Sequence, residues 1–178
     1  MKKHSLAMPA AVIVGVLAAS PAAAVDSIAL EAGSGYGTDM ARVALQRDMR
    51  QRWLESGDWQ LGSYWKVGLG YWRRNAAAGQ DADLAEIGLT PVLRFQQTSG
   101  RGLYVEGGFG VHLLSRSHIG DLRLGTLVQF GSSIEVGFRF GDKGQYDLSV
   151  CYQHLSNADI KQPNDGIDFN QIRFRHHF

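Results

Sequence analysis

The chain has 178 residues, with 18 Lys and Arg against 17 Asp and Glu, one Cys, four Pro and 22 Gly. Its length predicts a single domain. A formal net charge of +1 gives no basic field for holding nucleic acid through its phosphates. One Cys excludes an internal disulfide and a multi-thiolate zinc site. Because Pro is scarce, the many glycines indicate tight sheet geometry rather than flexible linkers.

The first 24 residues have the pattern of a secretory signal peptide. Lys2 and Lys3 form a positive region, residues 6–17 are almost unbroken apolar, and residues 22–24 are small alanines. We expect cleavage after Ala24 and a mature domain of residues 25–178. An uncleaved anchor helix is the alternative, but the apolar stretch is short for it.

The rest of the chain alternates between apolar and polar residues with a period of two. In residues 59–71 the odd positions are mostly apolar and the even positions mostly small or polar. The same alternation returns in 103–113, 128–140 and 172–178. This period indicates strands with one apolar face. We predict eight strands, at roughly 26–36, 40–50, 58–73, 83–97, 101–114, 124–141, 145–156 and 167–178.

The lengths of these strands and of their connections point to a membrane barrel. A membrane-spanning strand needs about 9–11 residues, and such barrels have even strand numbers from eight upward. The connections at 97–101 and 141–144 are short, whereas those at 74–83, 115–123 and 157–166 are longer. Outer-membrane barrels have short periplasmic turns and longer external loops. We therefore predict an all-β fold, an eight-stranded antiparallel transmembrane β-barrel in the outer membrane, with residues 51–57 as a longish periplasmic turn.

The polar face of the predicted strands carries balanced charge, which a narrow barrel can pair inside itself. An eight-stranded barrel is just wide enough to be filled by side chains. We expect a side-chain-filled polar interior containing six acids and six bases, namely Glu31, Arg42, Asp48, Lys66, Glu86, Arg94, Glu106, Glu135, Arg139, Asp147, Arg173 and Arg175.

The apolar face would then contact lipid. Trp59 and Tyr71 on that face are spaced like two aromatic girdles, about 28 Å apart after strand tilt, and Phe178 resembles a C-terminal assembly signature. A soluble barrel of the lipocalin kind, apolar inside and polar outside, has the same alternation; strand length, girdle spacing and Phe178 favour the membrane.

Three polar residues fall on the face that should contact lipid. His154 and Ser156 continue the outward positions of the seventh strand, and Asp168 precedes those of the eighth. A hairpin that pairs 154 with 168 brings the side chains within about 5 Å at Cβ. Ionisable groups on a lipid face suggest function, and a Ser, a His and a carboxylate suggest acyl transfer. Interfacial polar residues brought together by chance are the competing interpretation.

The segment from His154 to Asp168 resembles the active-site segment of the PagL family, the outer-membrane lipid A 3-O-deacylases. The signal peptide, the length and the eight-strand pattern also fit that family. The resemblance implies an esterase that removes the acyl chain at position 3 of lipid A from the outer leaflet, without a metal or other cofactor. The expected partners are lipopolysaccharide and the surrounding lipid, with a homodimer left open and no nucleic acid.

The resemblance also assigns roles to single residues. It makes Ser156 the nucleophile, His154 its base, and Asp168 the acid that orients the base, where the best-known members carry Glu. Asn157 and Asn164 match motif asparagines and are the candidates for oxyanion stabilisation and positioning. Asp159, in contrast, stands where family members commonly have Gly.

Substrate contacts are expected along the wall and in the loops at the same end. The acyl chain would lie past Tyr152 and its apolar neighbours, and the sugar phosphates near loop cations; Tyr152, Lys161 and Arg116 are the candidate substrate-binding residues. The full set of loop cations is Arg73, Arg74, Arg116, Arg123 and Lys161, and ordinary solvated loop charge is the favoured interpretation of these five.

Two other functions stay open from the sequence. A non-enzymatic small barrel serving adhesion or envelope integrity would explain the fold but would leave His154, Ser156 and Asp168 without a purpose. A different lipid-modifying enzyme, such as a phospholipase or an acyltransferase, would use the same residues on another substrate.

Overall fold

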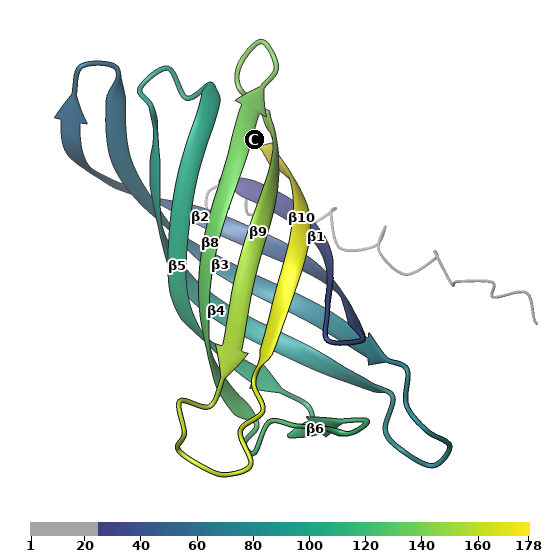
Figure 1. Cartoon of the computed structure of the whole chain (residues 1–178). Coiled ribbons are helices and arrows are strands. Elements are labelled where there is room, and N and C mark those ends of the chain that lie inside the picture. The colour runs from purple at the N-terminus through teal and green to yellow at the C-terminus, as the bar shows by residue number, and fades with distance from the viewer. Residues whose placement is uncertain (1–24) are drawn as a thin grey trace, which may run out of the picture.

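Eight strands of the chain close into one antiparallel barrel (Figure 1). The computed structural model describes residues 25–178, so the expected signal peptide lies outside the described residues. Around the barrel the order is β1-β10-β9-β8-β5-β4-β3-β2, and β6 and β7 form a separate two-stranded sheet. The strands are β1 Ser27–Gly35, β2 Thr38–Ser56, β3 Trp59–Arg74, β4 Asp83–Gln97, β5 Gly102–Leu114, β6 His118–Ile119, β7 Leu122–Arg123, β8 Val128–Phe140, β9 Tyr146–Ser156 and β10 Ile167–His177.

All eight predicted barrel strands are present, but two sequence expectations were wrong. Residues 51–57 are not a loose turn, because β2 continues to Ser56 through register shifts after Met49 and after Trp53. Each shift interrupts the period of two, which hides the strand from a pattern search. The strand expected from 124 begins at Val128, and the segment before it contains the β6–β7 hairpin.

The connections divide the barrel into two different ends. One end, called the terminal end here, holds the C-terminus, residue 25 and the turns at 57–58, 98–101 and 141–145. The other, called the loop end, holds the tight turn at Tyr36 and Gly37 and the long loops at 75–82, 115–127 and 157–166. The expected alternation of short and long connections is therefore confirmed, apart from that one tight turn.

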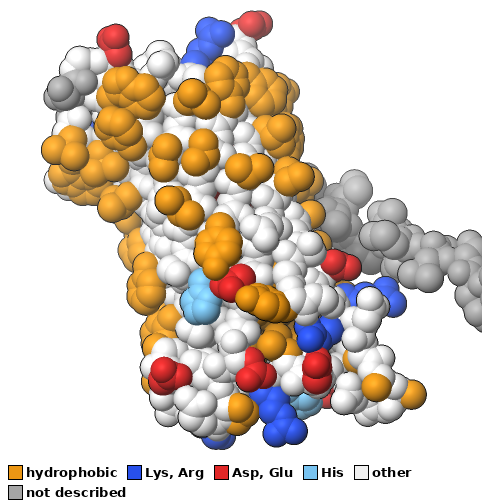
Figure 2. All heavy atoms as spheres, viewed as in Figure 1, with side chains coloured by type: hydrophobic (Ala, Val, Ile, Leu, Met, Phe, Trp, Pro, Cys, Tyr) orange, Lys and Arg blue, Asp and Glu red, His pale blue; other side chains and the backbone are white. Residues whose placement is uncertain are grey.

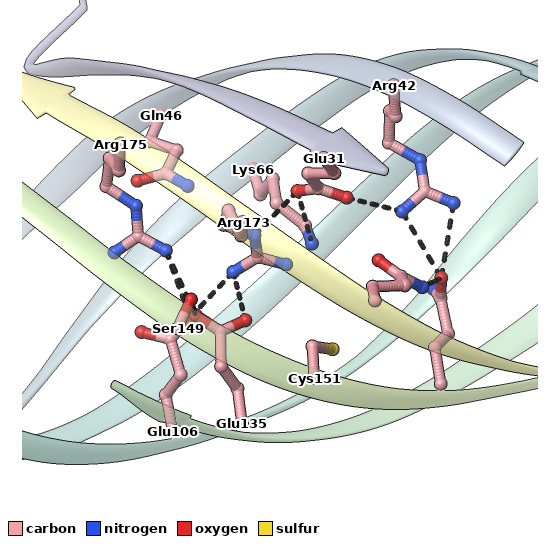
Figure 3. A network of polar contacts seen from close by, with 12 residues as sticks. Glu31, Arg42, Gln46, Lys66, Glu106, Glu135, Ser149, Cys151, Arg173 and Arg175 are labelled. Atoms are coloured by element: carbon pink, nitrogen blue, oxygen red, sulfur yellow. Dashed lines mark hydrogen bonds and ion pairs between the residues drawn. The ribbon is translucent and has the colours of Figure 1, made fainter. Parts of the chain in front are cut away.

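Charged side chains fill the middle of the barrel, as the alternation predicted (Figure 3). Ten of the twelve predicted interior charges are buried, but Asp48 is exposed and Arg139 half-buried, because both lie near the terminal end of the barrel. Arg173 lies 2.8 Å from Glu31 and 2.9 Å from Glu106, and it also contacts Glu135. Arg42 bridges Glu31 at 2.6 Å and Glu86 at 2.8 Å. Because every one of these groups is buried, each charge depends on its partners for stability.

Every barrel strand carries exposed large apolar side chains on the outer wall, and Figure 2 shows them on one face of the barrel. Leu69, Phe109 and Val150 are each more than 60% exposed. This arrangement excludes the inverted barrel, in which the apolar face would fill the centre. Within residues 25–178 no helix is long and apolar enough to cross a membrane.

The barrel interior is not polar throughout, because the loop end is closed by an apolar cluster. Ile119 and Leu122 of the β6–β7 hairpin, and Leu124 directly after it, pack against buried side chains of the barrel, among them Trp72 and Phe169. The indole of Trp72 also donates a 2.7 Å hydrogen bond to Glu86, at the boundary with the charged network. The hairpin therefore plugs the mouth of the barrel (Figure 1) and packs beside the loop after β9.

Candidate functional site

His154 and Asp168 face each other on the outer wall, near the loop end of β9 and β10. The two residues are direct partners in the β9–β10 ladder, as the predicted hairpin register required. His154 Nδ1 lies 2.7 Å from Asp168 Oδ1. The histidine side chain is 44% exposed and the aspartate side chain 27%, so the pair is open to the surroundings of the wall.

Ser156 ends β9 on the same face as His154 and is half-buried. A Cβ atom placed on Gly166 would lie 3.3 Å from His154 Cε1 and 3.6 Å from Ser156 Cβ. Gly166 therefore sits where the imidazole and the serine converge. Residues 25–178 contain no hydrogen bond between the Ser156 hydroxyl and His154; such contacts often tighten only with substrate.

A second serine also lies beside the histidine. Ser132 on β8 is the direct ladder partner of His154 and is exposed on the wall. Ser156 pairs instead with Phe130 of β8. The geometry thus offers His154 two neighbouring hydroxyls, and the Cε1 edge of the ring faces the side of Gly166 and Ser156.

Two tyrosines surround the aspartate. The hydroxyls of Tyr152, on β9, and of Tyr36, in the turn between β1 and β2, interact with the Asp168 carboxylate. Tyr152 was predicted from its outward position. Tyr36 was missed, because only the closure of the barrel by β1 and β10 brings its turn to Asp168; its place between two glycines was the signal of an exposed tight turn.

Asn157 is fully buried and holds neighbouring segments together. Its side-chain nitrogen donates to Leu124 O at 2.9 Å and to Lys161 O at 2.6 Å. Its backbone N–H donates to Asn164 Oδ1 at 3.1 Å. All its N–H donors are thus occupied, so contact with an oxyanion would require one of these bonds to open.

The residue that departs from the family pattern adopts a glycine-like backbone. Asp159 has a φ of 59°, in the left-handed region that favours Gly. Its carboxylate accepts hydrogen bonds from Gln162 and Asn164, each at 3.0 Å. The carboxylate is therefore tied down within the loop after β9.

The structure separates the loop cations into paired and unpaired groups. Arg116 lies 3.0 Å from Asp83 and 3.5 Å from Asp81. Arg74 hydrogen bonds to Asp121 at 2.8 Å, which lowers the pKa of that carboxyl. Lys161 and Arg123 line an open cavity of about 360 Å³. Within residues 25–178 no group of three or more His, Cys, Asp or Glu side chains is placed to hold a metal ion.

Comparison with known proteins identifies the family. The family described as lipid A 3-O-deacylase (PagL) matches residues 39–177. The chain belongs to this family. The lipid A deacylase PagL of Pseudomonas aeruginosa is 30% identical over 156 residues, covering 86% of this chain and 87% of that protein. The PagL of Bordetella bronchiseptica is 29% identical over 147 residues, covering 81% and 80%.

A solved structure agrees with this assignment. The crystal structure of the outer membrane enzyme PagL superposes with a TM-score of 0.76 at 26% identity, covering 85% of this chain and 99% of that one. The chain is thus an outer-membrane β-barrel and a hydrolase of the PagL family.

Proposed function

We propose that this protein hydrolyses the ester-linked acyl chain at position 3 of lipid A, with Ser156 as nucleophile, His154 as base and Asp168 as the orienting acid. The observation that carries the proposal is the 2.7 Å contact between His154 and Asp168 on the outer wall, in a chain of this family. Water-soluble esters would not require a catalytic pair that faces lipid. With both termini in the periplasm, the loop end reaches the outer leaflet, where lipid A resides.

The chemistry follows from the order of the three side chains. The Asp168 carboxylate accepts a hydrogen bond from the Nδ1–H of His154 and stays ionised. This bond holds the tautomer whose Nε2 is free to take the Ser156 proton as Oγ attacks the ester carbonyl. The tetrahedral intermediate expels the sugar hydroxyl, which receives that proton from His154. Water, activated by the same imidazole, then releases the fatty acid and restores Ser156. General-base assistance of this kind contributes about 10²–10⁴-fold to the rate.

The oxyanion requires donors beside Ser156, and Asn157 is the proposed one. A donor already aimed at the oxyanion contributes about 3 kcal/mol of transition-state stabilisation, and Asn157 would contribute less because its donors are engaged before substrate binds. The Asn157 amide lies next to the nucleophile in the chain, and it would exchange its bond to Lys161 O or Leu124 O for one to the oxyanion. Asn164, which accepts from the Asn157 backbone, acts as a positioning residue.

Mass spectrometry of lipid A from cells that produce each variant tests the proposal. Wild-type protein should remove one ester-linked hydroxyacyl group, and Ser156→Ala should leave lipid A intact. Ser132→Ala is the matched control, since this serine also borders His154, and it should retain activity. Unchanged lipid A with the wild type would favour a structural barrel. Fatty acid released from glycerophospholipids instead would indicate a phospholipase.

A further inference from the structure

The cavity at the loop end lies between two segments that are far apart in the sequence. One wall comes from the β6–β7 region, with Ser117, His118 and Arg123, and the other from the loop after β9, with Lys161 and Pro163. Its volume of about 360 Å³ is within the range of pockets that bind small molecules. We call it the loop groove.

The loop groove presents unpaired positive charge. Among residues 25–178, neither the Arg123 guanidinium nor the Lys161 ammonium group has an ion-pair partner. The nearby acids are already engaged: Asp165 accepts the Arg123 backbone N–H at 2.8 Å, and Asp159 accepts two side-chain amides of its own loop. Charged side chains also gather at this end in the space-filling view, whereas the wall is apolar (Figure 2).

The two walls are held together, so the groove is preorganised. Arg123 and Asp165 exchange two hydrogen bonds, one from each backbone N–H, at 2.8 and 3.0 Å. Asn157 bridges the same walls through Leu124 O and Lys161 O. Since Asn157 directly follows Ser156, the groove and the nucleophile are fixed to one another through a single buried residue.

We propose that the loop groove binds a phosphate group of the lipid A molecule whose ester is attacked by Ser156, with Arg123 and Lys161 as its cationic contacts. This inference rests on the proposed function. An anchored acyl chain points down the wall from Ser156, so the phosphorylated sugar extends toward the loops, where these cations lie. The guanidinium fork and the ammonium group are the side chains that bind phosphate oxygens best. Arg74 and Arg116 are already paired with carboxylates.

Kinetics on two forms of the substrate test the groove. The full-length protein in zwitterionic micelles is given lipid A with its phosphates, or the same lipid A after enzymatic dephosphorylation. We expect the wild-type KM to be about tenfold lower for the phosphorylated form, because Arg123 and Lys161 contact the phosphate. We expect kcat to be similar for the two forms. The double variant R123Q/K161Q should lose this preference, whereas R123K/K161R should keep most of it. K143Q, at the terminal end, is the matched control for lost charge.

Three outcomes would overturn the groove assignment. Equal KM values for both forms in an active wild-type enzyme would reject it and leave the proposed function intact. A preference that R123Q/K161Q retains would place the phosphate elsewhere. Inhibition by phosphatidic acid without preference between the lipid A forms would assign the groove to phospholipid headgroups. If neither form is hydrolysed, the proposed function fails, and the affinities of the Ser156→Ala protein for the two forms still decide the groove: a tenfold ratio supports it and equality rejects it.

Discussion

At the scale of single residues, the Asp168 side chain reaches His154 although it is one methylene shorter than Glu. Asp168 replaces the Glu that the family resemblance leads one to expect, yet its carboxylate reaches His154 Nδ1 at 2.7 Å. The direct ladder pairing of the two residues brings the backbones close enough for the short side chain. Tyr36 and Tyr152 add polar contacts that restrain the carboxylate.

We predict that Asp168→Asn lowers kcat for deacylation by roughly 10²–10⁴-fold. The amide keeps the shape of the side chain but no longer stabilises the imidazolium or fixes its tautomer. Heat-modifiable gel mobility should show an intact barrel. Activity within threefold of the wild type would remove Asp168 from the proposed mechanism.

A comparison of Gly166 with Gly57 separates a steric effect at the site from the backbone strain of a positive φ. Gly166 has a φ of 64°, and an added Cβ would press on His154 Cε1 at 3.3 Å. Gly57 has a φ of 58° with nothing within 4 Å. We predict that Gly166→Ala and Gly57→Ala each destabilise the barrel by about 1–2 kcal/mol, measured by urea titration, but that only Gly166→Ala impairs deacylation. Equal activity of the two variants would contradict the assigned geometry.

At the scale of elements, the strands and the site register could be predicted from the sequence, but the cap could not. The period of two placed His154, Ser156 and Asp168 on one face, because successive side chains of a strand point to opposite faces of the sheet. The β6–β7 hairpin carries too few residues to show a period. Its apolar partners come from separate barrel strands, so only the closed fold reveals the cluster.

The hydrogen bonds of Asn157 show a similar limit. The motif predicted a functional asparagine beside Ser156, and the structure adds a buried bridge to Leu124 O in the segment after β7. Because Asn157 and Leu124 are 33 residues apart in the chain, their contact produces no local sequence pattern. Because Asn157 directly follows the proposed nucleophile Ser156, this bridge also ties the position of Ser156 to the segment after β7.

We predict that Asn157→Asp loosens the loop end without unfolding the barrel. The variant keeps the size of the side chain but turns its oxygens toward two carbonyls, which costs about 2–3 kcal/mol. Hydrogen exchange should increase in residues 115–127 and 157–166, and deacylation should fall. Asn164→Asp, which keeps the oxygen that accepts the Asn157 N–H, should perturb exchange less; equal exchange in both variants would contradict the bridging role.

At the scale of the whole molecule, the residues that stabilise the barrel and those of the proposed site lie in different places. The charges are paired in the centre (Figure 3), the wall faces lipid, and the site lies at the rim. Charged side chains fill the middle of the barrel and the apolar cluster fills its loop end, so the interior is packed rather than an open channel. The packed centre holds β9 and β10 in the register that the proposed catalytic pair, His154 and Asp168, needs.

We predict that Arg173→Met destabilises the barrel by about 3–5 kcal/mol, because it leaves Glu31, Glu106 and Glu135 without a shared cation. Thermal unfolding in micelles measures the loss, with the exposed Lys143→Met as control. Unfolding midpoints that agree between the two variants would show that the network adds no stability.

The central claim is that Ser156 is an activated nucleophile that can be reached from the lipid-facing wall, and labelling tests it most directly. Outer membranes containing the protein are treated with a long-chain fluorophosphonate, and the modified peptide is sequenced by mass spectrometry. We expect a single adduct on Ser156, lost in His154→Ala and retained in Ser132→Ala. An adduct on Ser132, or Ser156 labelled equally well without His154, would contradict the account.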